Sequence, residues 1–278
     1  MIEVFETLAE YFSLKYVISA LIVGVLISVC SSLLGVSLVL KRCSMIGDGL
    51  SHVAFGALAL ASVLGFAPLA FSVPIVVIAA VILLRISENA KIGGDAAIAM
   101  ISSASLALGV IFVSLSGMNT DITSYMFGSL VALERGDVII SVILSVFILV
   151  FYLLFFKRIF AVTFDENFAR ATGISTEIYK TAIAIITAIT IAVGMRVIGA
   201  MLISALVIFP ALTSMRIFGS FRGVAISSVI VAGVCAFVGI SASCLFSLPA
   251  GASIVVSNMA AFCVFSVIGF FKRRLNKG

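Results

Sequence analysis

Residues 16–40 read YVISALIVGVLISVCSSLLGVSLVL, a run without a single charged side chain. This stretch decides the class of fold, because an α-helix of about 20 apolar residues is long enough to cross the hydrocarbon core of a bilayer. The basic pair Lys41 and Arg42 ends the run. We therefore expect a membrane-spanning helix here, and the rest of the chain repeats the pattern.

The composition extends this conclusion to the whole chain. Hydrophobic residues make up 63% of the 278 residues and charged residues only 10%, and the mean hydropathy is +1.36. A soluble domain of this length does not have such a composition. We predict an all-α polytopic membrane protein that forms a single transmembrane domain over residues 1–278.

Further apolar runs fix the expected number of crossings. They occupy residues 53–84, 96–120, 138–156, 181–215 and 223–271, and only Arg196 interrupts them. Three of these runs are long enough to be divided in two: the first at Gly65, Pro68 and Pro74, the second near Arg196, and the third at residues 247–251. The result is about nine transmembrane helices. Small residues along the runs favour close helix approach and a compact bundle.

Two shorter segments are expected at the membrane surface. Residues 1–15 place apolar residues against Glu3, Glu6 and Glu10, an amphipathic pattern that suits a surface helix or the entrance to the first span. These acids and the lack of a basic leader region argue against a cleaved signal peptide. Residues 122–133 are short for a crossing, so we expect an interfacial or re-entrant helix there.

The basic residues indicate the orientation. The expected crossings place all 17 lysines and arginines on one side except Lys15, Arg135 and Arg196. The side richer in basic residues is normally cytoplasmic. We therefore expect the N-terminus outside and the C-terminus inside. The net charge of +5 is explained by this asymmetry and gives no reason to expect nucleic acid as a partner.

The most distinctive polar stretch runs from Gly47 to Gly56 and reads GDGLSHVAFG. It contains the only histidine of the chain, His52, four residues after Asp48, so a helix places both side chains on one face. A carboxylate and an imidazole form a plausible half of a site for zinc, manganese or ferrous iron. Alternatively, Asp48 favours a helix N-terminus and His52 bonds between helices.

The five cysteines show no pairing typical of a metal site or a disulfide framework. They are Cys30, Cys43, Cys235, Cys244 and Cys263. Several lie inside apolar runs, so we interpret them as small hydrophobic residues. Cys43 lies near Asp48 in sequence, which leaves it as a minor candidate ligand.

The longest polar interruption lies between Ile159 and Lys180. It contains FDENFARATG at residues 164–173, in which mixed charges accompany a short apolar stripe. This pattern is typical of a helix outside the bilayer that presents a surface to another protein. A plain solvated loop is the alternative.

The run Met45–His52 resembles the signature of the metal-ion ABC transporter permeases, the membrane subunits of bacterial zinc, manganese and iron importers. Further matches follow in that family's order: Asp95–Met100 with Ala107–Gly109, Tyr125–Leu130, Phe164–Glu166 with Ala169 and Gly173, and Gly199–Leu202 through Pro210–Ala211. Two departures are Gly49, where the family often has Ala or Ser, and Phe55-Gly56 in place of a common Pro-Gly.

The resemblance implies a permease in the bacterial cytoplasmic membrane, with no cofactor bound permanently and a divalent metal ion as cargo. It would act as a dimer, with itself or a paralogue, together with cytoplasmic ATPase subunits and an extracytoplasmic metal-binding protein. Asp48 and His52 would bind the metal. Four residues of the loop 159–180 would couple the permease to the ATPase: Asp165, Glu166, Ala169 and Gly173. The sequence contains no phosphate-binding loop of the type G-x-x-x-x-G-K-[ST], so ATP hydrolysis is expected from a separate subunit.

Two other classes of protein fit the same apolar bundle. A secondary transporter or cation channel would use the Asp48/His52 pair as a relay, and a membrane scaffold would only pack it. Neither needs the polar segment at 159–180.

On the expected outer side, Asp121, Glu134 and Asp137 either collect cations or serve as capping and loop acids. Arg196 would repel a metal ion, so we expect it to anchor a helix end.

Overall fold

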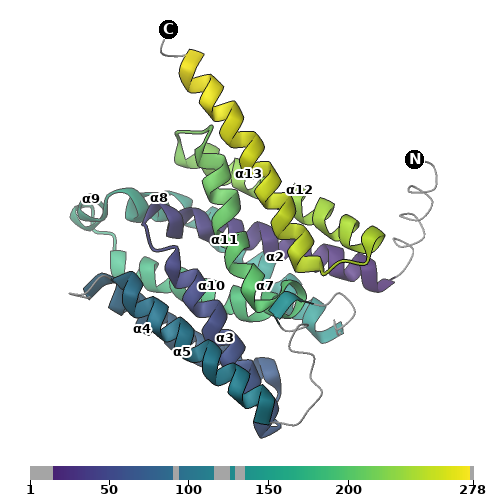
Figure 1. The fold of residues 1–278 in the computed structure, drawn as a ribbon. Helices are drawn as coiled ribbons and strands as arrows, with labels where there is room; N and C mark the ends of the chain where they lie inside the picture. The colour runs from purple at the N-terminus through teal and green to yellow at the C-terminus, as the bar shows by residue number, and fades with distance from the viewer. Residues whose placement is uncertain (1–14, 90–93, 116–125, 129–134, 276–278) are drawn as a thin grey trace.

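The computed structural model describes residues 15–89, 94–115, 126–128 and 135–275, which form helices joined by short turns (Figure 1). The expected surface segment at residues 1–15 lies outside the described residues apart from Lys15, at the start of the first helix. The expected interfacial segment at 122–133 also lies outside them apart from residues 126–128. These two predictions therefore stay predictions.

Eight described helices are long and apolar enough to cross a membrane. They are α2 (Lys15–Leu40), α3 (Met45–Leu64), α4 (Pro68–Asn89), α5 (Gly94–Leu115), α7 (Arg135–Leu154), α10 (Thr176–Ile198), α12 (Phe221–Phe246) and α13 (Ala250–Leu275). The apolar helix α11 (Ala200–Met215) is shorter, about 24 Å at 1.5 Å per residue. The prediction of an all-α polytopic membrane protein is confirmed, and the ninth expected crossing corresponds to α11.

The expected breaks between helices occur where the sequence places turn residues, with one correction: Pro74 does not break the chain but lies inside α4, seven positions into the helix that begins at Pro68. α3 ends at Gly65, whose φ of 69° lies in the left-handed region and whose N–H bonds back to the carbonyls of Ala61 and Ser62. Glycine adopts this conformation without the strain that a side chain causes. α10 and α11 are separated only by Gly199, three residues after Arg196.

The helices divide into an interior set and a peripheral set. Most of α2, α3 and α10 is buried inside the bundle, whereas most of α5 and α13 is uncovered. Figure 1 shows α4 and α5 next to α3, and α12 next to α13 and α2, and these helices pack against one another in the same pairs. α3 therefore lies in the interior, with α4, α5 and α11 around it.

Small residues allow the closest helix contacts. A side chain at Gly56 in α3 would meet the backbone carbonyl of Ser105 in α5 at 2.8 Å, and one at Gly109 would meet the ring of Phe55. Gly35 in α2 faces the carbonyl of Val207 in α11 in the same way. Such close approach gives membrane helices the dispersion contacts that hold them together in lipid. The close approach at Gly56 and Gly109 holds α3 against α5.

Candidate metal site and coupling region

The start of α3 places Asp48 and His52 on one helix face. Asp48 lies in the first turn, and Nε2 of His52 lies 3.7 Å from its Oδ2. This distance is too long for a hydrogen bond. Nδ1 of His52 is buried and has no hydrogen-bond partner among the described residues. The two predicted ligands therefore lie side by side on one helix face and are not tied to each other by a hydrogen bond.

The pair lies on a single uncovered stripe of an otherwise buried helix. From Met45 to Leu60, the residues of α3 that are not buried recur every three or four positions, which is one face of a helix; they are Met45, Asp48, His52, Gly56 and Leu60. In the last turn of α3, Ser62, Val63 and Leu64 are also not buried. The other faces of α3 pack into the bundle, with Gly49 against Ile98 of α5. The side chain of Asp48 is 39% exposed and that of His52 15%. The pair is thus open on one side only.

One copy of the chain does not complete a metal site at this position. Among the residues that the structure describes, no group of three or more His, Cys, Asp or Glu side chains could hold a metal ion. Cys43 does not complete the pair, because its Sγ bonds to the carbonyl of Lys41 and lies 3.9 Å from Oγ of Ser87. Burial is the main reason that the pKa of this thiol is raised, so the thiol is not a ready thiolate ligand.

The polar segment at 159–180 folds as two short helices before α10. They are α8 (Phe156–Phe164) and α9 (Glu166–Ala171). Oδ1 of Asp165 accepts a 2.9 Å hydrogen bond from the N–H of Phe168 and so caps α9. Ala169 is fully buried, and Gly173 turns the chain with a φ of 81°. Three of the four predicted coupling residues, Asp165, Ala169 and Gly173, therefore shape this segment.

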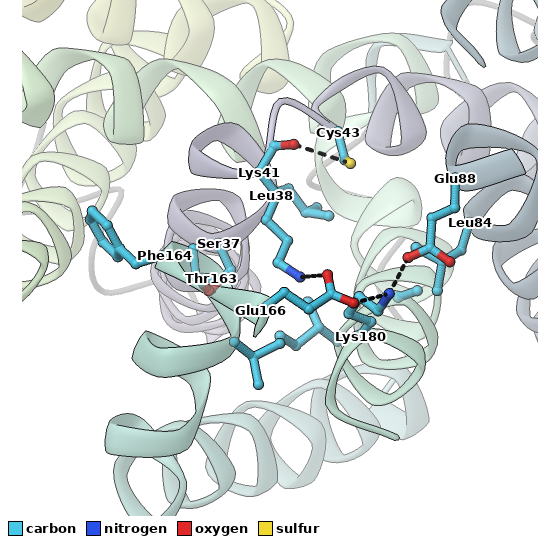
Figure 2. A pocket seen from close by; sticks show the side chains of 13 residues that line it. Ser37, Leu38, Lys41, Cys43, Leu84, Glu88, Thr163, Phe164, Glu166 and Lys180 are labelled. Atoms are coloured by element: carbon cyan, nitrogen blue, oxygen red, sulfur yellow. Dashed lines mark hydrogen bonds and ion pairs between the residues drawn. The ribbon is translucent and has the colours of Figure 1, made fainter. Parts of the chain in front are cut away.

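The fourth predicted coupling residue, Glu166, points back toward the membrane helices. It belongs to a charge cluster that joins the ends of α2, α4, α9 and α10 and consists of Lys41, Arg85, Glu88, Glu166, Arg170, Glu177 and Lys180. Oε1 of Glu166 accepts hydrogen bonds from Lys180 at 2.9 Å and Arg170 at 2.7 Å. Figure 2 shows Glu166 between Lys41 and Lys180, with Glu88 on the far side of Lys180.

The electrostatic surroundings keep Glu166 ionised. Partial burial alone would raise the pKa of this carboxyl group. The hydrogen bond and charge of Lys180, with the charges of Lys41 and Arg170, outweigh that effect and lower the pKa. Glu166 is therefore an ion-pair partner within the chain.

The sequence matches the ABC 3 transport family over residues 13–269. The chain belongs to this family. Among its relatives, the high-affinity zinc uptake system membrane protein ZnuB of Buchnera aphidicola subsp. Acyrthosiphon pisum is 32% identical over 247 residues, 88% of this chain and 94% of that protein. The manganese import system permease protein ScaB of Streptococcus gordonii is 28% identical over 259 residues, 93% of either protein.

A solved structure shares the whole fold. It is described as PsaBC from Streptococcus pneumoniae in complex with Fab, and one of its chains matches with a TM-score of 0.84 and 27% identity over 95% of both chains. The resemblance seen in the sequence motifs is therefore confirmed at the level of family and fold. As a member of the ABC 3 transport family, the chain is a membrane permease.

The structure corrects the interpretation of one acid that the sequence places on the outer side. Asp137 is neither a solvated loop acid nor an open cation collector, because it is buried in the first turn of α7 and accepts a 2.6 Å hydrogen bond from Nη1 of Arg196. Arg196 thereby connects the end of α10 to the start of α7, as expected of a residue that anchors a helix end. Asp121 and Glu134 lie outside the described residues.

Sequence reasoning missed the charge cluster as a unit. Its members Arg85 and Glu88, and Glu177 and Lys180, lie in sequence segments about 90 residues apart, so no local motif joins them. The available signal was their common side, because the expected crossings place the ends of α2 and α4 and the start of α10 together. Opposite charges gathered at one end of a helix bundle in lipid are expected to pair.

Proposed function

We propose that this member of the ABC 3 transport family is the permease subunit of an importer for a divalent transition metal, zinc, manganese or ferrous iron. The names of its relatives, which include a zinc uptake protein and a manganese import permease, support this cargo class. A separate cytoplasmic ATPase drives alternating access, and an extracytoplasmic binding protein delivers the ion.

The observation that carries the proposal is the position of Asp48 and His52 on the one uncovered stripe of α3. In a symmetric dimer, a two-fold axis beside this stripe brings a second pair opposite the first. Two carboxylates and two imidazoles then supply four ligands, the number that zinc prefers. The same oxygen and nitrogen donors accept manganese and ferrous iron.

Such a site suits transport because it binds the ion without trapping it. A set of thiolates would hold zinc as a closed structural site, and the nearest thiol, Cys43, bonds elsewhere. The metal passes to the pair from the outer side and leaves it when the dimer opens inward. Each step needs only an exchange of ligands at Asp48 and His52.

The cytoplasmic side is assigned from charge. The residues that the positive-inside rule assigns to the cytoplasm include Lys41, Arg85, Arg170 and Lys180, and these side chains meet in the charge cluster. Arg196 is one of the basic residues that the rule assigns to the outer side, and it pairs with Asp137 away from the charge cluster. This grouping supports an N-terminus outside and a C-terminus in the cytoplasm.

The segment of α8 and α9 is the proposed docking surface for the ATPase. The rings of Phe164 and Phe168 are 56% and 61% exposed at this end of the bundle. Asp165, Ala169 and Gly173 hold the segment in shape and so present these rings. An amphipathic helix of this kind fits an apolar groove on a partner.

The experiment is metal uptake by cells that express the permease with its ATPase and its binding protein. We compare the native chain with Asp48→Ala and His52→Ala at equal membrane abundance, with zinc, manganese and ferrous iron supplied separately. Asp95→Asn serves as a control, because it also removes a carboxylate, on the exposed first turn of α5. We expect one metal to accumulate, both ligand variants to abolish uptake, and the control to transport normally.

The outcomes separate the proposed function from its rivals. Normal uptake by both ligand variants would make Asp48 and His52 packing residues. Uptake that persists after deletion of the ATPase would favour a secondary transporter or a channel. The ATPase should co-purify with both ligand variants, because neither substitution touches α8 or α9.

A further inference from the structure

Lys180 is the centre of the charge cluster and the most buried of its members, with 7% of its side chain exposed. Its ammonium lies 2.6 Å from Glu88 of α4, 2.9 Å from Glu166 of α9 and 2.8 Å from Glu177 of its own helix. An ammonium has three N–H donors, so each can serve one carboxylate. Removal of one member from a buried ionic group is costly, because the others keep uncompensated charge.

The cluster adds ion pairs to the packing of α9. Among the described residues, α9 packs chiefly against α8 and α10. Through Glu166, α9 also reaches α2 at Lys41, and through Lys180 it reaches Glu88 at the end of α4. A displacement of α9 therefore acts on two further membrane helices by way of ion pairs.

One of these connections leads to the helix that carries the proposed metal ligands. Lys41 follows α2 directly, and Arg42, with a φ of 59°, makes the sharp turn that precedes α3. α3 begins at Met45, so Asp48 lies in the first turn after this junction. Lys41 is therefore joined to Asp48 and His52, the proposed metal ligands, by a short and sharply bent segment.

A cavity of about 340 Å³ lies beside the cluster. Its apolar walls come from four helices and include Leu38, Leu84, Val162 and Ile183, while Lys41, Glu166 and Lys180 lie at its polar side (Figure 2). Protein interiors are normally close-packed, and a close-packed contact resists displacement. The cavity therefore leaves unfilled space between α8 and the described parts of α2, α4 and α10.

We propose that Lys180, with Glu166, is a positioning device that transmits displacement of α9 to α3 and α4 and so couples ATP hydrolysis to metal movement. This inference rests on the proposed function as an ABC permease. Lys180 belongs neither to the proposed metal pair, Asp48 and His52, nor to the proposed docking surface on α8 and α9. Its replacement should therefore leave ATP hydrolysis intact and disconnect it from transport.

The test uses the complete importer, permease with ATPase, reconstituted in proteoliposomes with the metal-loaded binding protein. Two quantities are measured on the same vesicles, metal uptake and ATP hydrolysis. The variants are Lys180→Met, Lys180→Arg, which keeps the charge, and Lys272→Met. The last is a matched control, since it removes an exposed lysine at the far end of α13.

For Lys180→Met we expect the ATPase to co-purify and hydrolyse ATP, while metal moved per ATP hydrolysed falls roughly tenfold, within the range known for residues in coupling networks. Lys180→Arg should restore most of the ratio, and Lys272→Met should match the native chain. An unchanged ratio in Lys180→Met overturns the inference. If Lys180→Met does not accumulate in the membrane, Glu166→Gln tests the same inference. The amide keeps the size of the side chain and an acceptor oxygen but loses the charge. A native ratio of metal moved to ATP hydrolysed in Glu166→Gln also overturns the inference.

Failure of the proposed function gives a different result. If the native importer moves none of the three metals with ATP, the cargo assignment is wrong. The proposed function then fails before any Lys180 variant is compared. If the native importer transports and Lys180→Met transports equally well per ATP, the permease assignment stands and the coupling role of Lys180 is rejected.

Discussion

Arg196, at the end of α10, donates a 2.6 Å hydrogen bond to the buried carboxylate of Asp137, at the start of α7. Replacement of Arg196 by Met should destabilise the protein by about 3 kcal/mol, because a largely buried carboxylate loses its charged partner. The thermal unfolding midpoint of the detergent-solubilised protein measures this loss. Lys272→Met, which removes an exposed charge, should leave the midpoint unchanged. An equal midpoint for both variants would show that the ion pair contributes nothing.

The lowered pKa of Glu166 predicts a pH-dependent contribution to stability. A carboxyl group whose folded pKa is depressed stabilises the fold above its unfolded pKa, about 4.3 for Glu, and this contribution is lost as the pH falls through the folded value. Hydrogen exchange of the α9 amides should therefore show more protection in the native chain than in Glu166→Gln near neutral pH. The difference should shrink below about pH 4. A difference that grows on acidification would contradict the assignment.

The turn after α9 should require glycine at position 173. Gly173 has a φ of 81° and open space around it, so a methyl group meets no neighbour there and acts only through backbone strain. A left-handed conformation costs an alanine about 1–2 kcal/mol, and Asn tolerates it better. We expect Gly173→Ala to reduce the amount of ATPase that co-purifies and Gly173→Asn to reduce it less.

A matched control for this turn is Gly136→Ala in α7. Gly136 also has open space around it but no positive φ. Its replacement should leave ATPase binding unchanged and stabilise the helix slightly, since Ala exceeds Gly in helix propensity. Equal effects of Gly173→Ala and Gly136→Ala would mean that the φ angle at 173 is not what matters.

Cys43 should be dispensable for metal uptake. Its thiol lies against the carbonyl of Lys41 and the hydroxyl of Ser87. Cys43→Ser preserves a small hydrogen-bonding side chain in this place. Uptake of zinc, the metal that thiolates bind most readily of the three, should match that of the native chain. A selective loss of zinc uptake would place this sulfur on the ion's path.

The sequence was sufficient for the architecture because charge-free runs and their breaks follow directly from the requirements of the bilayer. It also predicted correctly that Asp48 and His52 share a helix face, since a spacing of four residues in a helix fixes a common face, while their role as metal ligands stays a prediction. The charge cluster around Lys180 was not predicted, because it joins residues from separate segments whose meeting depends on helix packing. The pairing of Asp137 with Arg196 was missed for the same reason, as the two lie 59 residues apart.

The contact between α3 and α5 should be sensitive to a single added methyl group. A Cβ at Gly56 would lie 2.8 Å from the backbone carbonyl of Ser105, and a carbonyl in a helix cannot move aside as a flexible side chain can. Gly56→Ala should therefore force the two helices apart and cost about 1–3 kcal/mol, as overpacking does. A Cβ at Gly47, on the same helix, would meet its nearest neighbour, Val207, at an ordinary 3.7 Å. Gly47→Ala should be neutral or stabilising in thermal unfolding, and a similar loss in both variants would show that close approach at Gly56 does not determine how α3 is held.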